Sequence, residues 1–425
     1  MNEIAETARY DIAEFSTFDR FLRQQLLGRM TGLRHGRLVL EDACGTIELG
    51  DTASSHPDLQ IRLQVLDPGF YRALARNGSV GAGESYMEGQ WHCDNLVGLI
   101  QLLVRNRDLL DGMESGLARF GGMAMRGWHA LRRNTRDGSR RNIAAHYDLG
   151  NDFFNLFLSP DLMYSSAIWT DPADTLEIAS TRKLERICRK LDLQPTDRVI
   201  EIGTGWGGFA LYAAKNYGCH VTTTTISREQ HALASERVAA AGMSGHVKLL
   251  LEDYRDLDGQ YDKLVSIEMV EAIGAPYLDV YFEKLGKLLK TNGLALVQAI
   301  TIEDHRYQQA LESVDFIKRH VFPGSFIPSI NTLLTAKTRA SDLALIQLED
   351  FGSSYALTLK AWRERFMAKL VQVRAQGFDD RFIRMWEFYL AYCEGGFRER
   401  SIGVAHLLMA KPGNSCAALL PELRA

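Results

Sequence analysis

The chain has 425 residues, of which 46% are hydrophobic, so it is long enough for two domains with a core each. Its net charge of −4 gives no general electrostatic reason to expect a nucleic acid partner. The six cysteines are scattered without ligand-like spacing, which argues against a zinc site or a disulfide framework. We therefore expect a cytoplasmic protein with no metal.

The first 125 residues mix strand-like runs, 36–40 and 61–65, with helical runs at 70–76 and 96–110. This pattern predicts a small α+β domain over 1–125. The glycine-rich stretch 78–89 is interpreted as a structural turn, because no strong strand precedes it.

A basic segment, 126–142, contains Trp128 and is predicted to be the linker to a second domain, 143–425. Its solvated-connector interpretation is favoured, and contact with anionic lipid headgroups is the alternative. The longest apolar run, 96–104, is too short to span a bilayer, and the N-terminus lacks the order of a signal peptide. Any membrane contact should therefore be peripheral.

From residue 143 the pattern alternates between strands and helices. We predict helices at 175–191, 209–216, 227–241 and 277–289, and strands at 199–202, 219–225, 247–251, 261–267 and 294–300. This alternation predicts an α/β fold with a doubly wound, mostly parallel, Rossmann-like sheet whose ligand lies at the carboxyl ends of the strands. Residues 301–412 are expected to be a mostly helical insertion that ends in a strand at 404–410.

A buried strand runs into a glycine-rich turn at 198–208, and a helix should start near Phe209. Gly203, Gly205 and Gly207 let the backbone turn sharply and approach a ligand without a Cβ in the way. A turn of this kind is typical of nucleotide binding, although a plain β-to-α connection has the same pattern.

The residues after the second strand, 221–227, lack the carboxylate that a dinucleotide site needs, and no P-loop pattern is present in the sequence. Thr225, Ser227 and Gln230 are instead placed to hydrogen-bond a ribose or a carboxylate. Ser227 is also expected to cap the next helix, with Gln230 completing a capping box.

Asp253 and Tyr254 follow the third strand, where they could accept from an adenine amino group and stack on its ring. An ordinary loop pair is the alternative. The strand, the glycine turn and these polar residues together describe an S-adenosylmethionine site better than any other nucleotide site.

Several phrases point to one family. They are His146–Phe154, Leu162–Trp169, Glu201–Gly207, Ser266–Gly274, Ile317–Pro328 and Cys393–Arg398. Together they resemble the cyclopropane-fatty-acyl-phospholipid synthases and the mycolic acid cyclopropane synthases, from about residue 143 to the end. The phrase at 70–91 resembles the N-terminal domain of the phospholipid enzymes.

The resemblance implies transfer of a methyl group from S-adenosylmethionine to a cis double bond of a phospholipid acyl chain, followed by closure of a cyclopropane ring. It implies work at the inner leaflet of the membrane and, through the N-terminal domain, a homodimer. Such chemistry needs an aligned methyl group and a dry pocket. The residues that would contact the cofactor by similarity are Tyr164, Ser165, Gly203, Gly205, Thr225, Ser227, Gln230 and Tyr254.

In the family a bicarbonate ion, held by Cys, Glu, His and Tyr, is thought to take the proton. Glu271 and Tyr355 match this set, whereas Ser166 stands at the Cys position and Gln298 at the His position. A serine hydroxyl and a glutamine amide can still donate to an anion, so the bicarbonate site survives with altered electrostatics or is lost. If it is lost, the product is a methyl-branched or methylene-bearing chain.

Two further residues are candidates. Cys393 stands where the family carries a reactive cysteine near the active site, although a small core residue is its usual role. Glu271, with Glu268 close by in the sequence, is expected to anchor whatever acts as the base. Two functions of other classes stay open, namely methylation of a soluble amine and binding without catalysis.

Overall fold

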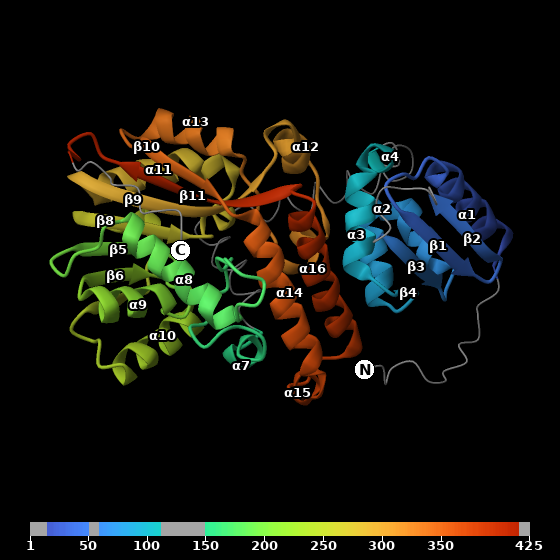
Figure 1. Ribbon diagram of the computed structural model, residues 1–425, viewed down its shortest axis with the longest axis horizontal. Helices are drawn as coiled ribbons and strands as arrows, with labels where there is room; N and C mark the ends of the chain where they lie inside the picture. The colour runs from blue at the N-terminus through green and yellow to red at the C-terminus, as the bar shows by residue number, and fades with distance from the viewer. Residues whose placement is uncertain (1–14, 51–58, 112–148, 416–425) are drawn as a thin grey trace. The chain divides into compact units, whose positions relative to one another are not determined.

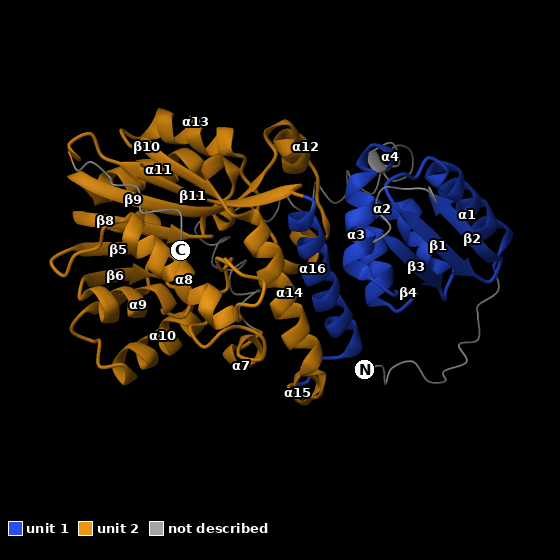
Figure 2. Cartoon of the chain, in the orientation of Figure 1, with its two compact units in different colours: residues 1–125, 377–399 blue, residues 126–376, 400–425 orange. Residues whose placement is uncertain are grey.

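The computed structural model describes residues 15–50, 59–111 and 149–415, which form two compact units. Residues 1–125 and 377–399 belong to one unit, and 126–376 with 400–425 to the other (Figure 2). The predicted linker lies outside the described residues, so the domain boundaries of the sequence analysis stay a prediction.

The N-terminal unit is a four-stranded sheet with helices. Its elements are α1 (Thr17–Met30), β1 (Arg37–Asp42), β2 (Gly45–Gly50), β3 (Gln60–Val65), α2 (Gly69–Met87), β4 (Trp91–Cys93), α3 (Leu96–Arg105), α4 (Arg107–Asp111) and α16 (Asp380–Arg398). The strand order is β2-β1-β3-β4, with β1 parallel to β3 and the other pairs antiparallel. This agrees with the predicted α+β character.

Two local predictions in this unit were wrong. Residues 78–87 are not a turn but the second half of α2, which is kinked at Gly78 (φ 55°). Helix is favoured there because glycine lets the backbone pack closely: a Cβ on Gly81 would lie 2.0 Å from the Ala73 carbonyl oxygen. The single helix predicted at 96–110 breaks at Asn106, whose amide donates to the Arg34 carbonyl over 2.6 Å.

The larger unit contains a seven-stranded sheet (Figure 1). Its strands are β5 (Arg198–Ile202), β6 (His220–Thr224), β7 (Val247–Leu250), β8 (Tyr261–Ile267), β9 (Leu289–Ile302), β10 (Ala344–Asp350) and β11 (Ile402–Ala410). The order is β10-β11-β9-β8-β5-β6-β7, and only the β10–β11 and β11–β9 pairs are antiparallel. The predicted mostly parallel sheet is confirmed.

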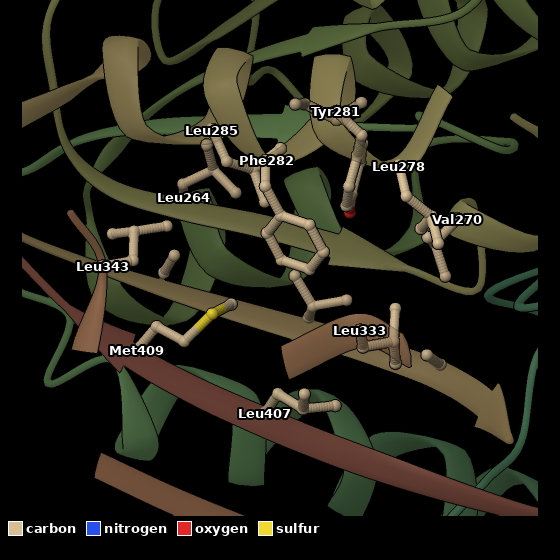
Figure 3. Packing of buried hydrophobic residues seen from close by; sticks show 14 of the residues in the cluster. Leu264, Val270, Leu278, Tyr281, Phe282, Leu285, Leu333, Leu343, Leu407 and Met409 are labelled. Carbon is tan, nitrogen blue, oxygen red and sulfur yellow. The ribbon is translucent and has the colours of Figure 1, made fainter. Parts of the chain in front are cut away.

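Helices cover both faces of this sheet. The helices of this unit are α7 (Asn151–Phe154), α8 (Leu176–Lys190), α9 (Gly208–Tyr217), α10 (Arg228–Ala240), α11 (Leu278–Leu288), α12 (Tyr307–Glu312), α13 (Ile330–Ala340), α14 (Gly352–Ala368) and α15 (Leu370–Ala375). Helices α8 and α9 pack on one face, where Ile187, Phe209 and Val265 share a core. On the other face, α11 and α13 bury Phe282 and Leu333 against Met409 of β11 (Figure 3).

The stretch 301–412 is mostly helical and ends in β11, as predicted. Besides the helices it contains β10, an edge strand whose residues alternate between exposed and half-buried. This strand was missed because its short apolar run also fits a helix. A π-helical turn, Ile317–Val321, precedes the turn-rich stretch at 322–329.

Among the described residues, no helix is long and apolar enough to cross a membrane.

Candidate active site

The glycine turn lies at the carboxyl end of β5 and leads into α9. Gly203, Gly205 and Gly207 have φ of 102°, 51° and 85°, a region that favours glycine. A Cβ built on Gly205 would meet nothing within 4 Å, so open space lies in front of the backbone there. A turn that needs glycine and faces open space fits the close approach of a nucleotide such as S-adenosylmethionine.

A buried carboxylate holds this turn against β6. Glu201 accepts a hydrogen bond from Thr223 Oγ1 over 2.6 Å, and the Thr223 and Thr204 hydroxyls lie 2.7 Å apart. Burial raises the pKa of Glu201 to about 8. Sequence reasoning did not single out Glu201 for this role, although a carboxylate within a buried strand is a signal that could have found it.

The polar residues after β6 bind one another. The Thr225 hydroxyl donates to Gln230 Oε1 over 2.8 Å, and the Ser227 hydroxyl accepts from the Gln230 backbone N–H over 3.2 Å. Ser227 is thus the N-cap of α10, as predicted. The predicted capping box was wrong, because the Ser227 backbone N–H donates to Thr225 Oγ1 over 3.1 Å and the Gln230 side chain binds Thr225 instead. Contact with the cofactor stays a prediction for all three residues.

Asp253 and Tyr254 follow β7. Both carboxylate oxygens of Asp253 accept from Arg255, at 2.8 and 2.6 Å. The Arg255 guanidinium also lies 5.6 Å from the centre of the Tyr254 ring. Arg255, which was not among the predicted site residues, fixes both residues and occupies much of the acceptor capacity of Asp253 that an adenine amino group would need. Their contact with adenine therefore stays a prediction.

Tyr164 and Ser165 lie between α7 and α8. The Tyr164 ring packs 5.2 Å from the Trp362 ring and 5.3 Å from the Phe154 ring, measured between centroids. The Ser165 hydroxyl accepts from Lys183 Nζ over 2.7 Å. Lys183 is fully buried, and burial lowers its pKa to about 8. Lys183 was not predicted to lie in the site, because α8 carries several other charged residues and the sequence does not distinguish Lys183 from them.

Three donors meet at the carboxylate of Glu268, just after β8. The Ser166 backbone N–H and Gln298 Nε2 donate to Glu268 Oε1 over 2.8 and 2.7 Å, and Tyr355 Oη donates to Glu268 Oε2 over 2.8 Å. Ser166, Gln298 and Tyr355 are buried, whereas Glu268 keeps part of its surface exposed. The structure thus brings together three of the four residues expected to hold bicarbonate, around a carboxylate of the chain itself.

The fourth residue, Glu271, lies in the same bend. Its Oε1 accepts from the Ile300 backbone N–H over 2.5 Å, and its Oε2 is buried with no hydrogen-bond partner among the described residues. Burial, and then repulsion from Glu268, raise the pKa of Glu271 to about 8. Glu271 is therefore the carboxyl of the pair that retains its proton at neutral pH.

The expected bicarbonate donors are already engaged. The Ser166 hydroxyl donates to the Ala167 carbonyl over 3.0 Å, and its contact with an anion stays a prediction. Gln298 Oε1 lies 2.9 Å from Nε2 of the fully buried His406, which fixes the amide with its Nε2 toward Glu268. A bicarbonate ion does not fit this arrangement, because Glu268 uses its donors and would repel a second anion.

Cys393 lies on α16, which groups with the N-terminal unit. Its expected place near the active site and its role stay predictions.

The glycine turn after β5 and the bend that carries Glu268 after β8 lie close together at the carboxyl ends of these strands. A Cβ on Gly203 would touch the side chain of Met269, the residue after Glu268, at 3.2 Å. A doubly wound sheet with a glycine turn after its first strand is typical of nucleotide-binding α/β enzymes, and the family match makes this chain an S-adenosylmethionine-dependent methyltransferase. Within that class it belongs to the mycolic acid cyclopropane synthetase family, whose model matches residues 134–407.

Individual relatives agree with this assignment. The chain is 38% identical to the tuberculostearic acid methyltransferase UfaA1 of Mycobacterium tuberculosis, over 80% of this chain and 81% of the relative. It is 37% identical to the cyclopropane-fatty-acyl-phospholipid synthase of Escherichia coli, over 82% and 87%. The solved cyclopropane synthase MmaA2 from Mycobacterium tuberculosis superposes with a TM-score of 0.60 at 27% identity, over 64% of this chain and 98% of that structure.

Proposed function

We propose that this chain transfers the methyl group of S-adenosylmethionine to the cis double bond of an unsaturated acyl chain in a membrane phospholipid and closes a cyclopropane ring. The carrying observation is the hydrogen-bonded carboxylate Glu268 beside the glycine turn, since ring closure needs a base next to the methyl donor. The E. coli relative, which is named a phospholipid synthase, supports the choice of substrate.

S-Adenosylmethionine supplies an electrophilic methyl group on a sulfonium. The protein must hold that group in line with a weakly nucleophilic alkene and keep water from the cation that forms. Aromatic rings around Tyr164 and the buried Trp362 suit this task, because they exclude water and their faces attract positive charge. Gly205 leaves the space that the nucleoside needs.

The direct test mixes the purified chain with labelled S-adenosylmethionine and vesicles of monounsaturated phospholipid, and then analyses the acyl chains by mass spectrometry for the added CH₂ and by proton NMR for a ring or a double bond. The expected product gains one CH₂ and has no double bond. A product that gains CH₂ but keeps a double bond would refute ring formation. Methylation of soluble amines without lipid, or cofactor binding without any turnover, would refute the lipid substrate.

A second product has its own support. The relative UfaA1 is named a tuberculostearic acid methyltransferase, and its identity to this chain is as high as that of the phospholipid synthase. The pair Ser166 and Gln298 also departs from the cyclopropane synthase pattern. The same cation could shift a hydride from the methylated carbon to its neighbour and then lose a proton from the new methyl group, which leaves a methylene group that a reductant would convert to a methyl branch. The ring and the methylene product have the same mass, so proton NMR, which distinguishes cyclopropane protons from vinyl protons, separates them.

The proposed substrate lies in a bilayer, so we also propose peripheral membrane contact. From the resemblance of the N-terminal domain we further propose a homodimer. Co-sedimentation with anionic and neutral vesicles tests the first, and light scattering coupled to gel filtration tests the second. An equal fraction of the chain in the pellet with and without vesicles would refute membrane contact. A monomer at assay concentration would refute the homodimer.

A further inference from the structure

Glu268 is held as a binding site would hold an anion. Its two oxygens accept from Ser166 N, Gln298 Nε2 and Tyr355 Oη, all within 2.8 Å. Hydrogen bonds to the charged form of a carboxylate favour that form. The three donors come from separate parts of the chain, so their convergence is a product of the fold.

The backbone at Glu268 is strained toward this position. Its φ is 47°, in the left-handed region that costs a residue with a Cβ about 1 kcal/mol or more. The Glu268 N–H donates to the Gln298 carbonyl over 2.8 Å, which holds the bend against the end of β9. Strain of this kind in a non-glycine residue is typical of functional sites, because the surrounding structure must maintain it.

The surroundings of Glu268 and Glu271 favour different protonation states for the two carboxyl groups. Lys183 favours the charged form of Glu268, and the Glu268 carboxylate in turn disfavours a charge on Glu271. Glu268 accepts from three donors, whereas Glu271 accepts at its Oε1 from the Ile300 backbone N–H. Glu268 is therefore the member that carries the negative charge, and Glu271 the member that carries a proton. Burial raises the pKa of both, because each charge is poorly solvated.

We propose that the Glu268 carboxylate is the resident base of this enzyme and replaces the bicarbonate ion of the family. The inference rests on the proposed function. After methyl transfer, a C–H bond of the new methyl group breaks, its electron pair forms the second C–C bond of the ring, and the proton goes to a Glu268 oxygen. The charge balances, because the sulfonium becomes a neutral thioether and the proton leaves later to water.

Two variants of Glu268 test this role. Glu268→Gln keeps the shape but removes the negative charge, and Glu268→Gly relieves the strained φ while leaving the three donors without an acceptor. We expect each to lower turnover by roughly 100-fold or more, as for loss of a general base, with S-adenosylmethionine affinity changed by less than about 3-fold. Glu283→Gln, at an exposed position of α11, is the matched control and should keep full activity.

The decisive measurement compares buffers depleted of and supplemented with bicarbonate. The natural chain should be equally active in both, whereas Glu268→Gly should recover roughly 10-fold or more with bicarbonate or formate, because the anion can bind the vacated donors. Loss of wild-type activity on depletion, full activity of Glu268→Gln, or absence of rescue in Glu268→Gly with intact cofactor binding would overturn the inference. A wild-type chain that transfers no methyl to lipid would instead refute the proposed function itself.

Discussion

The phenol of Tyr355 donates a hydrogen bond of 2.8 Å to Glu268, which joins helix α14 to the bend after β8. The two residues are 87 positions apart in the sequence. Through this bond the insertion after residue 301 contributes a donor to the Glu268 carboxylate in the candidate active site.

Replacing Tyr355 with Phe should weaken the base without removing it. A hydrogen bond to a charged group contributes about 1.5–3 kcal/mol, so we expect kcat to fall roughly 10- to 100-fold. Loss of a donor raises the pKa of Glu268, which moves the acidic limb of the pH–rate profile to higher pH. Tyr212→Phe removes a similar 2.9 Å bond, to Glu185 between α8 and α9, and should leave the profile unchanged. Equal profiles for both variants would contradict this role.

A side chain at Gly205 should block the cofactor. Gly205→Val adds a branched group to the open space before the turn, and we expect the Kd for S-adenosylmethionine, measured by calorimetry, to rise at least roughly 10-fold. Gly242→Val is the matched control, since Gly242 also has a positive φ (69°) and no atom within 4 Å of a Cβ. Both variants should lose about 1–2 kcal/mol of stability from strain. Similar Kd values of Gly205→Val and Gly242→Val for S-adenosylmethionine would rule out binding of the cofactor at the glycine turn.

The raised pKa of Glu271 makes stability depend on pH. The native state keeps the Glu271 proton up to about pH 8, whereas the unfolded chain releases it near the ordinary value of 4.5. The contribution of this group to stability is therefore full below pH 4.5 and is lost as pH rises through 8.

Glu271→Gln mimics the protonated form, so its stability relative to the natural chain should increase between about pH 5 and about pH 9. Urea denaturation at both pH values measures the difference. Glu283→Gln should show no such trend. A constant difference between the natural chain and Glu271→Gln would mean that Glu271 titrates normally.

The core between α11 and the sheet should depend strongly on Phe282, which is fully buried (Figure 3). Phe282→Ala removes most of a ring from a packed site and should cost about 3–5 kcal/mol of unfolding free energy. On the same helix Val280 is 39% exposed, so Val280→Ala should change stability by less than about 0.5 kcal/mol. Chemical denaturation followed by circular dichroism compares the two, and equal losses would place Phe282 outside the core.

Local patterns predicted a large part of this protein. The strand at 261–267 was placed at its observed bounds, and the glycine turn and the alternation of strands and helices were also correct. These features depend on nearest neighbours, because glycine sets the backbone and buried parallel strands need continuous apolar runs. Where the local sequence pattern fits more than one structure, as at the kinked helix through Gly78 and the edge strand β10, the prediction was wrong.

The sequence by itself determined the class of fold and the kind of cofactor turn. Only the tertiary structure decided which carboxylate stands at the centre of the site. Glu268 lies 102 positions from Ser166 and 30 from Gln298, and no local pattern records that their donors meet on its oxygens. Parallel strands bring distant residues to one edge, so the charge that replaces the expected anion follows from chain packing.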